Sequence, residues 1–109
     1  MNTPRQDEVW LVSLDPTVDS EIRKTRPCIV VSPDEANEFL GAVIIAPMTT
    51  TERPYPTRVN ITFQNKRGQV AIDQIRAVDR RRFVRKLGVA PPLAAQDVAE
   101  VLVELFTRR

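Results

Sequence analysis

Residues 8–16 read EVWLVSLDP, and this stretch sets the pattern that the rest of the chain follows. Valine, tryptophan and leucine favour extended backbone, whereas Asp15 followed by Pro16 is typical of a turn. The stretch therefore predicts a strand over residues 8–14 and a polar loop after it over residues 15–26. Similar runs of strand-forming residues predict further strands at 28–31, 42–49, 57–63 and 69–78.

These predicted strands differ in their expected burial. Residues 28–31 read CIVV, an uninterrupted apolar run that favours burial on both faces. Residues 57–63 alternate apolar and polar side chains, which indicates a half-buried strand. Residues 66–68 (KRG) predict a hairpin turn before the strand at 69–78. In that last strand Asp73 is expected on one face with small apolar neighbours.

Near the C-terminus the hydrophobic period changes. Apolar residues recur at helical spacing, namely Val98, Val101, Leu102, Leu105 and Phe106. This spacing predicts one amphipathic helix over residues 94–107 that packs on the sheet. We see no internal repeat, low-complexity tract or linker, so residues 1–109 are expected to form a single domain. The expected fold class is mainly β: a compact antiparallel barrel or sheet with a C-terminal helix.

The composition bears on where in the cell the protein is expected to work. The sequence has no apolar run approaching the roughly 18 residues of a membrane span, and its first residues lack the apolar segment of a secretory signal. Cys28 is the single cysteine, so no internal disulfide can form. These features favour a cytoplasmic protein without membrane association. Trp10 and Cys28 are expected in the core.

The charge is unevenly distributed along the chain. The net charge is only +2, but residues 73–86 hold six Lys or Arg against two Asp. A guanidinium group matches phosphate oxygens with two parallel hydrogen bonds, so clustered arginine suits a phosphate-rich partner. The alternative is an ordinary solvated surface.

The residue types present exclude several kinds of catalysis. The chain has no histidine, one cysteine and three glycines. Zinc sites of the usual Cys/His types, Ser-His-Asp or Cys-His catalysis and a glycine-rich phosphate loop are therefore excluded. The acidic residues form no obvious cluster for a metal ion. An enzyme built from this chain is expected to use Arg, Thr and carboxylates on phosphate chemistry, with no cofactor.

Several separate motifs carry a family resemblance. The chain reads VWLVSLDPT at residues 9–17, KTRP at 24–27, IAPMT at 45–49 and DQIRAVD at 73–79. In this order and spacing they are similar to the MazF/PemK family of toxin endoribonucleases. The resemblance covers roughly residues 8–106. It implies a small SH3-like barrel of the CcdB/MazF type, a homodimer, and cleavage of single-stranded RNA at short sequences. It also implies inhibition by a cognate antitoxin protein of a type II toxin–antitoxin system.

Arg26 and Thr49 are the first candidate catalytic residues. Pro27 disfavours helical backbone at Arg26, so the guanidinium stands at a loop-to-strand junction, where it can hold a phosphate and stabilise developing charge. The competing interpretation is a surface salt bridge from Arg26 to Asp15 or Glu21. Thr49 ends a predicted strand, where its hydroxyl can bond the phosphate; it can equally be an ordinary strand residue.

Two carboxylates, Glu21 and Asp73, complete the candidate catalytic set. Either can accept a proton from the attacking 2′-hydroxyl or bond a base edge, while Asp73 can alternatively be a structural partner of Arg76 or of a backbone amide. Some relatives carry histidine or arginine where this chain has Asp19, Ser20 and Ala71, so the general base stays open. Candidate RNA-binding residues are Arg23, Lys24, Thr50, Gln74 and Arg76.

The predicted reaction is attack of the 2′-hydroxyl on the adjacent phosphate, leaving a 2′,3′-cyclic phosphate and a 5′-hydroxyl without a metal ion. Two other functions stay open for the same fold. One is a CcdB-like gyrase poison that acts through a protein contact. The other is a catalytically inactive module that binds RNA or sequesters an antitoxin.

Overall fold

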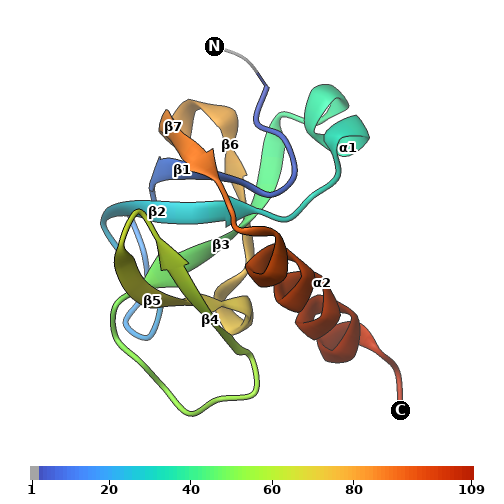
Figure 1. Ribbon diagram of the computed structural model, residues 1–109. Coiled ribbons are helices and arrows are strands. Elements are labelled where there is room, and N and C mark those ends of the chain that lie inside the picture. Colours follow the sequence, from blue (N-terminus) through green and yellow to red (C-terminus); the bar gives the residue numbers. More distant parts are fainter. Residues whose placement is uncertain (1–2) are drawn as a thin grey trace.

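The computed structural model describes residues 3–109, which form a mainly β fold with a C-terminal helix, as predicted (Figure 1). Seven strands form one curled sheet. In chain order they are β1 (Glu8–Ser13), β2 (Thr25–Val30), β3 (Ala42–Thr49), β4 (Arg58–Phe63), β5 (Lys66–Ala71), β6 (Arg76–Asp79) and β7 (Phe83–Val89). The remaining elements are helices α1 (Asp34–Phe39) and α2 (Pro92–Phe106) and the short 3-10 helices η1 (Ile72–Gln74) and η2 (Arg80–Arg82).

The central strand β3 changes partners along its length. One edge pairs antiparallel with β2, with Cys28 opposite Pro47. Along the other edge, residues 42–45 pair with β6 and residues 48–49 pair with β5. Pro47 lies between these two segments, and a residue without a backbone N–H suits a point where the ladder is interrupted. The change of partner brings the end of β3 against β5.

The strands of the curled sheet have a hydrophobic core on each face. Val9 and Ile29 belong to a cluster that Val98 of α2 covers. Their neighbours Trp10 and Cys28 belong to a second cluster, in which the Trp10 ring meets Phe83 edge to face at 5.7 Å between centroids. Adjacent residues of β1 and β2 therefore face different cores. The predicted burial on both faces is confirmed for residues 28–30, whereas Val31 is only partly buried and lies beyond β2; the predicted burial of Trp10 and Cys28 in the core is confirmed.

The prediction of one strand over residues 69–78 is wrong in its middle. β5 ends at Ala71, η1 follows, and β6 begins only at Arg76. The chain turns here because the Ile75 N–H bonds the Ile72 carbonyl oxygen at 3.3 Å. Asp73 consequently leaves the apolar face predicted for it, and its carboxylate accepts from the Thr57 hydroxyl instead.

The hairpin turn is also displaced from the predicted position. Gln64 and Asn65 have φ values of +51° and +63°, the left-handed pair expected of a two-residue hairpin loop. Lys66 and Arg67, predicted in the turn, belong to β5. Asparagine tolerates this backbone, but no glycine or proline marks the two positions, so the sequence signal is weak.

Apart from the two 3-10 helices, one strand and one helix have no counterpart among the sequence predictions. β7 is an edge strand in which Phe83 is buried while Arg85 and Lys86 are exposed, so it lacks apolar alternation. α1 depends on Asn37, whose fully buried amide donates to the carbonyl oxygens of Pro4 and Ser32. Neither helix within residues 3–109 combines the length and apolar character needed to cross a bilayer.

Candidate active site

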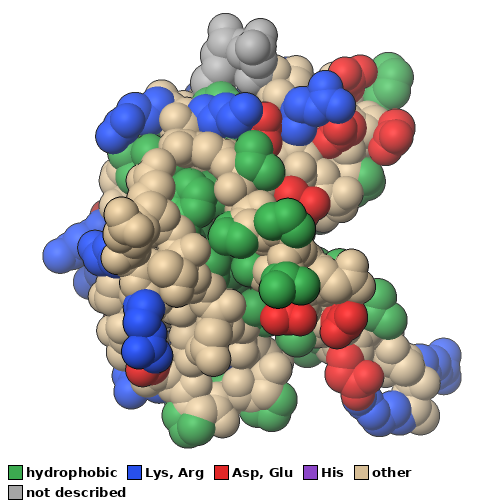
Figure 2. All heavy atoms as spheres, viewed as in Figure 1, with side chains coloured by type: hydrophobic (Ala, Val, Ile, Leu, Met, Phe, Trp, Pro, Cys, Tyr) green, Lys and Arg blue, Asp and Glu red, His purple; other side chains and the backbone are tan. Residues whose placement is uncertain are grey.

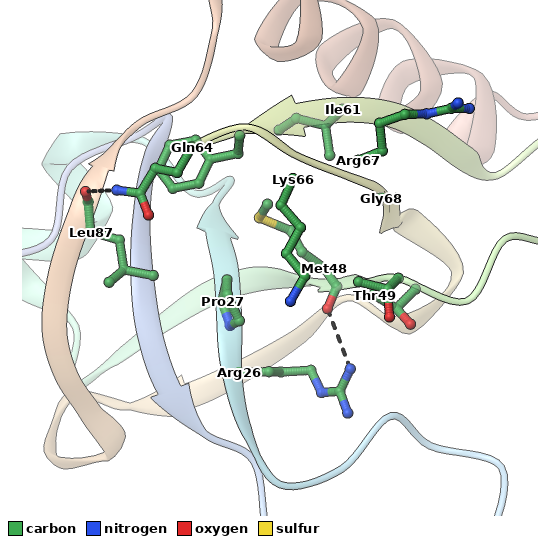
Figure 3. Close-up of a pocket in the computed structure, with 12 residues that line it drawn as sticks. Arg26, Pro27, Met48, Thr49, Ile61, Gln64, Lys66, Arg67, Gly68 and Leu87 are labelled. Carbon is green, nitrogen blue, oxygen red and sulfur yellow. Dashed lines mark hydrogen bonds between the residues drawn. The ribbon is translucent and has the colours of Figure 1, made fainter.

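Arg26 and Thr49 lie where β2 begins and β3 ends. The antiparallel register that sets Cys28 opposite Pro47 continues towards these two residues, so both reach the same rim of the barrel. The Arg26 side chain is held there by two backbone oxygens. Its Nε donates to the Arg23 carbonyl at 2.8 Å, and Nη1 lies 3.5 Å from the Met48 carbonyl (Figure 3). The guanidinium is thus oriented without being neutralised.

The alternative interpretation of Arg26 as a surface salt bridge finds no support in the geometry. Within residues 3–109, no carboxylate lies within ion-pair distance of Arg26. Asp15 instead accepts the Lys24 N–H at 3.1 Å, and Glu21 accepts the Val18 N–H at 2.6 Å.

An open groove of about 650 Å³ joins most of the predicted site residues. From the predicted set it is lined by Glu21, Arg23, Arg26, Thr49, Thr50, Asp73 and Gln74. Lys24 and Arg76 are not among its lining residues. Lys24 has a left-handed backbone with φ of +72° just before β2, and Arg76 donates to the Leu14 carbonyl at 3.1 Å. The structure therefore gives Lys24 a role in the backbone turn before β2 and Arg76 a hydrogen bond outside the groove.

Gln74 connects the groove to the loop between β1 and β2. Its Oε1 accepts the Ile22 N–H at 3.3 Å, and its Nε2 donates to the Ser20 carbonyl at 3.4 Å. The two bonds hold the backbone on either side of Glu21. The exposed Glu21 carboxylate is therefore carried by an anchored loop, although it lies far from Gln74 in sequence.

Asp73 is held in a side-chain cluster at one end of the groove. Arg58 contacts both carboxylate oxygens, at 2.8 and 3.2 Å, and the Thr57 hydroxyl donates at 3.0 Å. Partial burial raises the pKa of the Asp73 carboxyl, but the hydrogen bonds from Arg58 and Thr57 outweigh it and leave that pKa below its ordinary value. Asp73 is thus paired with Arg58; the predicted partner Arg76 lies elsewhere.

Among the groove residues that the sequence analysis did not assign to the site are Arg53, Tyr55 and Arg58. The Arg58 side chain is only 8% exposed, and its guanidinium carbon lies 5.2 Å from the centre of the Tyr55 ring. The loop that carries Arg53 is anchored by Gln69, which bonds the Arg53 N–H at 2.9 Å and its carbonyl at 3.2 Å. In the sequence, the only indication of these residues was that two arginines and the single tyrosine follow the threonines at 49–51.

The groove is suited to an anion. Arg23, Arg26 and Arg53 line it together with Arg58, whose charge is balanced by Asp73. Guanidinium groups gathered around a hydroxyl favour phosphate oxygens. In the part of the chain from residue 3 onward, no three His, Cys, Asp or Glu side chains gather as a metal site would require.

A curled antiparallel half-barrel with a C-terminal helix and an arginine-lined groove defines a small β-barrel protein whose groove is suited to an anion. Comparison with known proteins then identifies the family. Residues 5–106 match the family described as PemK-like, MazF-like toxin of type II toxin-antitoxin system. The chain therefore belongs to this toxin family, as its motifs predicted.

Individual relatives agree with this assignment. The endoribonuclease toxin MazF of Escherichia coli (strain K12) is 34% identical over 87 residues, which span 79% of this chain and 78% of the relative. The crystal structure of MazF (Form-I) from Deinococcus radiodurans has a TM-score of 0.85 and 26% identity, covering 96% of this chain and 97% of that one. A MazE-MazF crystal structure (Form-III) from the same organism gives 0.75 and 25%, covering 95% and 96%. The predicted MazF-type barrel is confirmed.

Thr49 is positioned by a close approach of β5, which leads to a testable prediction. A Cβ added at Gly68 would lie 2.7 Å from the Thr49 carbonyl oxygen. We expect Gly68→Ala to push the end of β3 outward, to lower the free energy of unfolding by about 1–3 kcal/mol and to impair any activity that needs Thr49. Denaturant unfolding measures the first effect. Gly41→Ala is the matched control, because no heavy atom lies within 4 Å of that Cβ; equal losses in both variants would contradict the prediction.

Proposed function

We propose that this chain is the toxin endoribonuclease of a type II toxin–antitoxin system, and that it cleaves single-stranded RNA in the groove around Arg26 and Thr49. The family match and the endoribonuclease name of the Escherichia coli relative support the class of activity. The observation that carries the site is the Arg26 guanidinium, which is oriented by two carbonyl oxygens and lines the groove together with three other arginines.

The proposed reaction is an internal transesterification. The 2′-oxygen forms a bond to the adjacent phosphorus, the bond from phosphorus to the 5′-oxygen breaks, and the products carry a 2′,3′-cyclic phosphate and a 5′-hydroxyl. The 2′-hydroxyl loses one proton and the departing 5′-oxygen gains one. Arg26 stabilises the charge that develops on the non-bridging oxygens. Thr49 Oγ1 already accepts the Thr51 N–H at 3.1 Å, so its own hydroxyl proton can donate to the phosphate.

Proton transfer falls to Glu21 in this proposal. Its carboxylate is exposed on the loop that Gln74 anchors at the groove. Asp73 is less suited to accept a proton, because its pKa is lowered by the bonds from Arg58 and Thr57. We therefore assign Asp73 to positioning Arg58, which serves with Arg23 as a phosphate contact. The half-exposed Tyr55 ring offers a face on which a base can stack. No cofactor or metal ion takes part in the proposed reaction.

The proposal includes two protein partners and a compartment. One partner is a cognate antitoxin, consistent with the family description and with the MazE-MazF complex of the Deinococcus relative. The other is a second copy of the chain. Apolar side chains gather between the barrel and α2 (Figure 2), and Val89, Leu93 and Val103 are each at least 60% exposed. Pairing of two copies would cover such surface. Messenger RNA as the substrate places the activity in the cytoplasm.

The deciding experiment is incubation of the purified protein with a long single-stranded RNA in EDTA. We expect discrete fragments with cyclic-phosphate and 5′-hydroxyl ends, because the groove supplies its positive charge from arginine. Cleavage that appears only after magnesium is restored would contradict the metal-free mechanism. Intact RNA together with trapped gyrase–DNA complexes would favour the CcdB-like alternative, and RNA affinity without cleavage would favour the inactive module.

A further inference from the structure

A second hollow of about 310 Å³ lies on the other side of Arg26 and Thr49, and the reaction described above does not use it. Arg26, Thr49 and Thr50 line both this hollow and the groove. The two depressions therefore share one wall, which consists of the two proposed catalytic residues, Arg26 and Thr49, together with Thr50. When the scissile phosphate of an RNA strand binds at Arg26, a neighbouring nucleotide lies either in the groove or in the hollow.

Part of the wall of the hollow is apolar and held in place. Met48, Ile61, Phe63 and Leu87 contribute apolar side chains from β3, β4 and β7. Gln64 bridges the open seam between β4 and β7, because its Nε2 donates to the Leu87 carbonyl at 2.9 Å (Figure 3). A flat heterocycle can bury its faces against such walls without any rearrangement of the backbone.

Lys66, an exposed residue of β5, supplies a positive charge to this hollow. Its side chain extends from β5 into the cavity, with the ammonium directed towards Pro27 and Met48 (Figure 3). Among residues 3–109 no carboxylate forms an ion pair with Lys66. Its sequence neighbour Arg67 also lines the hollow, but its guanidinium extends away from Lys66 and pairs with Glu52 at 3.4 Å. Adjacent basic residues of one hairpin thus have different orientations.

We propose that this hollow binds one of the two nucleotides that flank the scissile phosphate, and that it contributes to the choice of cleavage sequence. The base lies against Phe63, Ile61 and Leu87, and the Lys66 ammonium contacts the phosphate next to the one held by Arg26. The assignment rests on the proposed RNA cleavage. It adds the side of Arg26 on which a flanking nucleotide binds and the residues that contact this nucleotide.

The Lys66 contact can be tested by binding. The probe is a cleavable RNA of mapped sequence in which the nucleotide at the cut carries 2′-deoxyribose, so that no reaction occurs. We expect Lys66→Met to weaken binding about 3–10-fold and to reduce the slope of log affinity against log salt concentration by about 0.7, the loss of one phosphate contact. Arg85→Met removes an equal charge from the edge strand β7, outside both the hollow and the groove, and is expected to change affinity less than about 2-fold. Equal effects from both variants would overturn the assignment.

The base contact can be tested by sequence preference. Leu87→Phe narrows the hollow, and we expect it to lower cleavage of RNAs with a purine at one flanking position by about 10-fold relative to pyrimidine. Rates are measured on a set of RNAs that carry each base at each flanking position. A wild-type protein that cuts no RNA would refute the proposed function. A wild-type protein that cuts, with Lys66→Met and Leu87→Phe showing unchanged affinity and preference, would refute only this inference.

Discussion

Replacement of Arg26 by alanine is expected to lower kcat for RNA cleavage by about 10²–10³-fold, the usual cost of removing one preorganised donor to a developing oxyanion. The structure gives the reason, since the guanidinium is aligned by the Arg23 and Met48 carbonyl oxygens and no carboxylate competes for it among the described residues. Single-turnover cleavage of a mapped RNA in EDTA measures the effect. Full activity in Arg26→Ala would remove this residue from the mechanism.

Two companion variants separate charge from geometry at this position. Arg26→Lys keeps the charge but loses the planar fork, so we expect an intermediate loss of activity. Arg85 is an exposed arginine on the edge strand β7 and lines neither the groove nor the hollow, which makes Arg85→Ala the control for loss of overall positive charge. Unchanged thermal unfolding of the Arg26 variants would show that the defect is chemical and that the fold is intact.

Replacement of Arg58 by methionine is expected to lower kcat/KM about 10–100-fold, the range for losing a hydrogen bond to a charged group. Arg58 is only 8% exposed and is bound on one side by Asp73 and on the other by the Tyr55 ring. Asp73→Asn tests the other half of the pair. If Asp73 acts by positioning Arg58, the double variant will be no worse than Arg58→Met alone. A further loss in the double variant would instead indicate that Asp73 transfers a proton.

The same pair makes a prediction about acid stability. The folded-state pKa of Asp73 is lowered, so its ion pair stabilises the protein above the unfolded-state value of about 3.9, and the stabilisation is lost as pH falls through the folded-state pKa. The difference in free energy of unfolding between wild type and Asp73→Asn should therefore be constant near neutral pH and shrink below about pH 4. A difference that grew on acidification would contradict the lowered pKa.

Local sequence was sufficient for much of the fold. The apolar run at residues 28–31 and the helical spacing of Val98 and Val101 predicted a buried strand and a packed helix, and both are present. The motifs at 24–27 and 45–49 predicted the MazF/PemK family, which the match over residues 5–106 confirms. These features depend on residues that are close together in the chain, and hydrophobic period and motif spacing record such features directly.

The groove could be predicted only in part. Arg26, Thr49 and Glu21 come from the quoted motifs or their immediate neighbours, and the structure places them around one depression. Arg58, Tyr55 and Lys66 lie in segments with ordinary strand or loop patterns, so nothing local distinguishes them. They contribute to the site because β3 pairs with β6 along its first residues and with β5 at its end, and this pairing places the β4–β5 hairpin beside Arg26.

The sequence by itself determined the strand-rich fold class, the absence of histidine chemistry and the family. The tertiary structure alone decided that Asp73 pairs with Arg58 and that the side chains of Lys66 and Arg67 point in different directions. It also decided that Gln74 anchors a loop some fifty residues away through a hydrogen bond to Ile22. The physical reason is that hydrophobic burial depends on residue type and period, which are local properties of the chain. Ion pairs and directed hydrogen bonds depend on which atoms the closed sheet brings within about 3 Å, and no single segment of the chain contains that information.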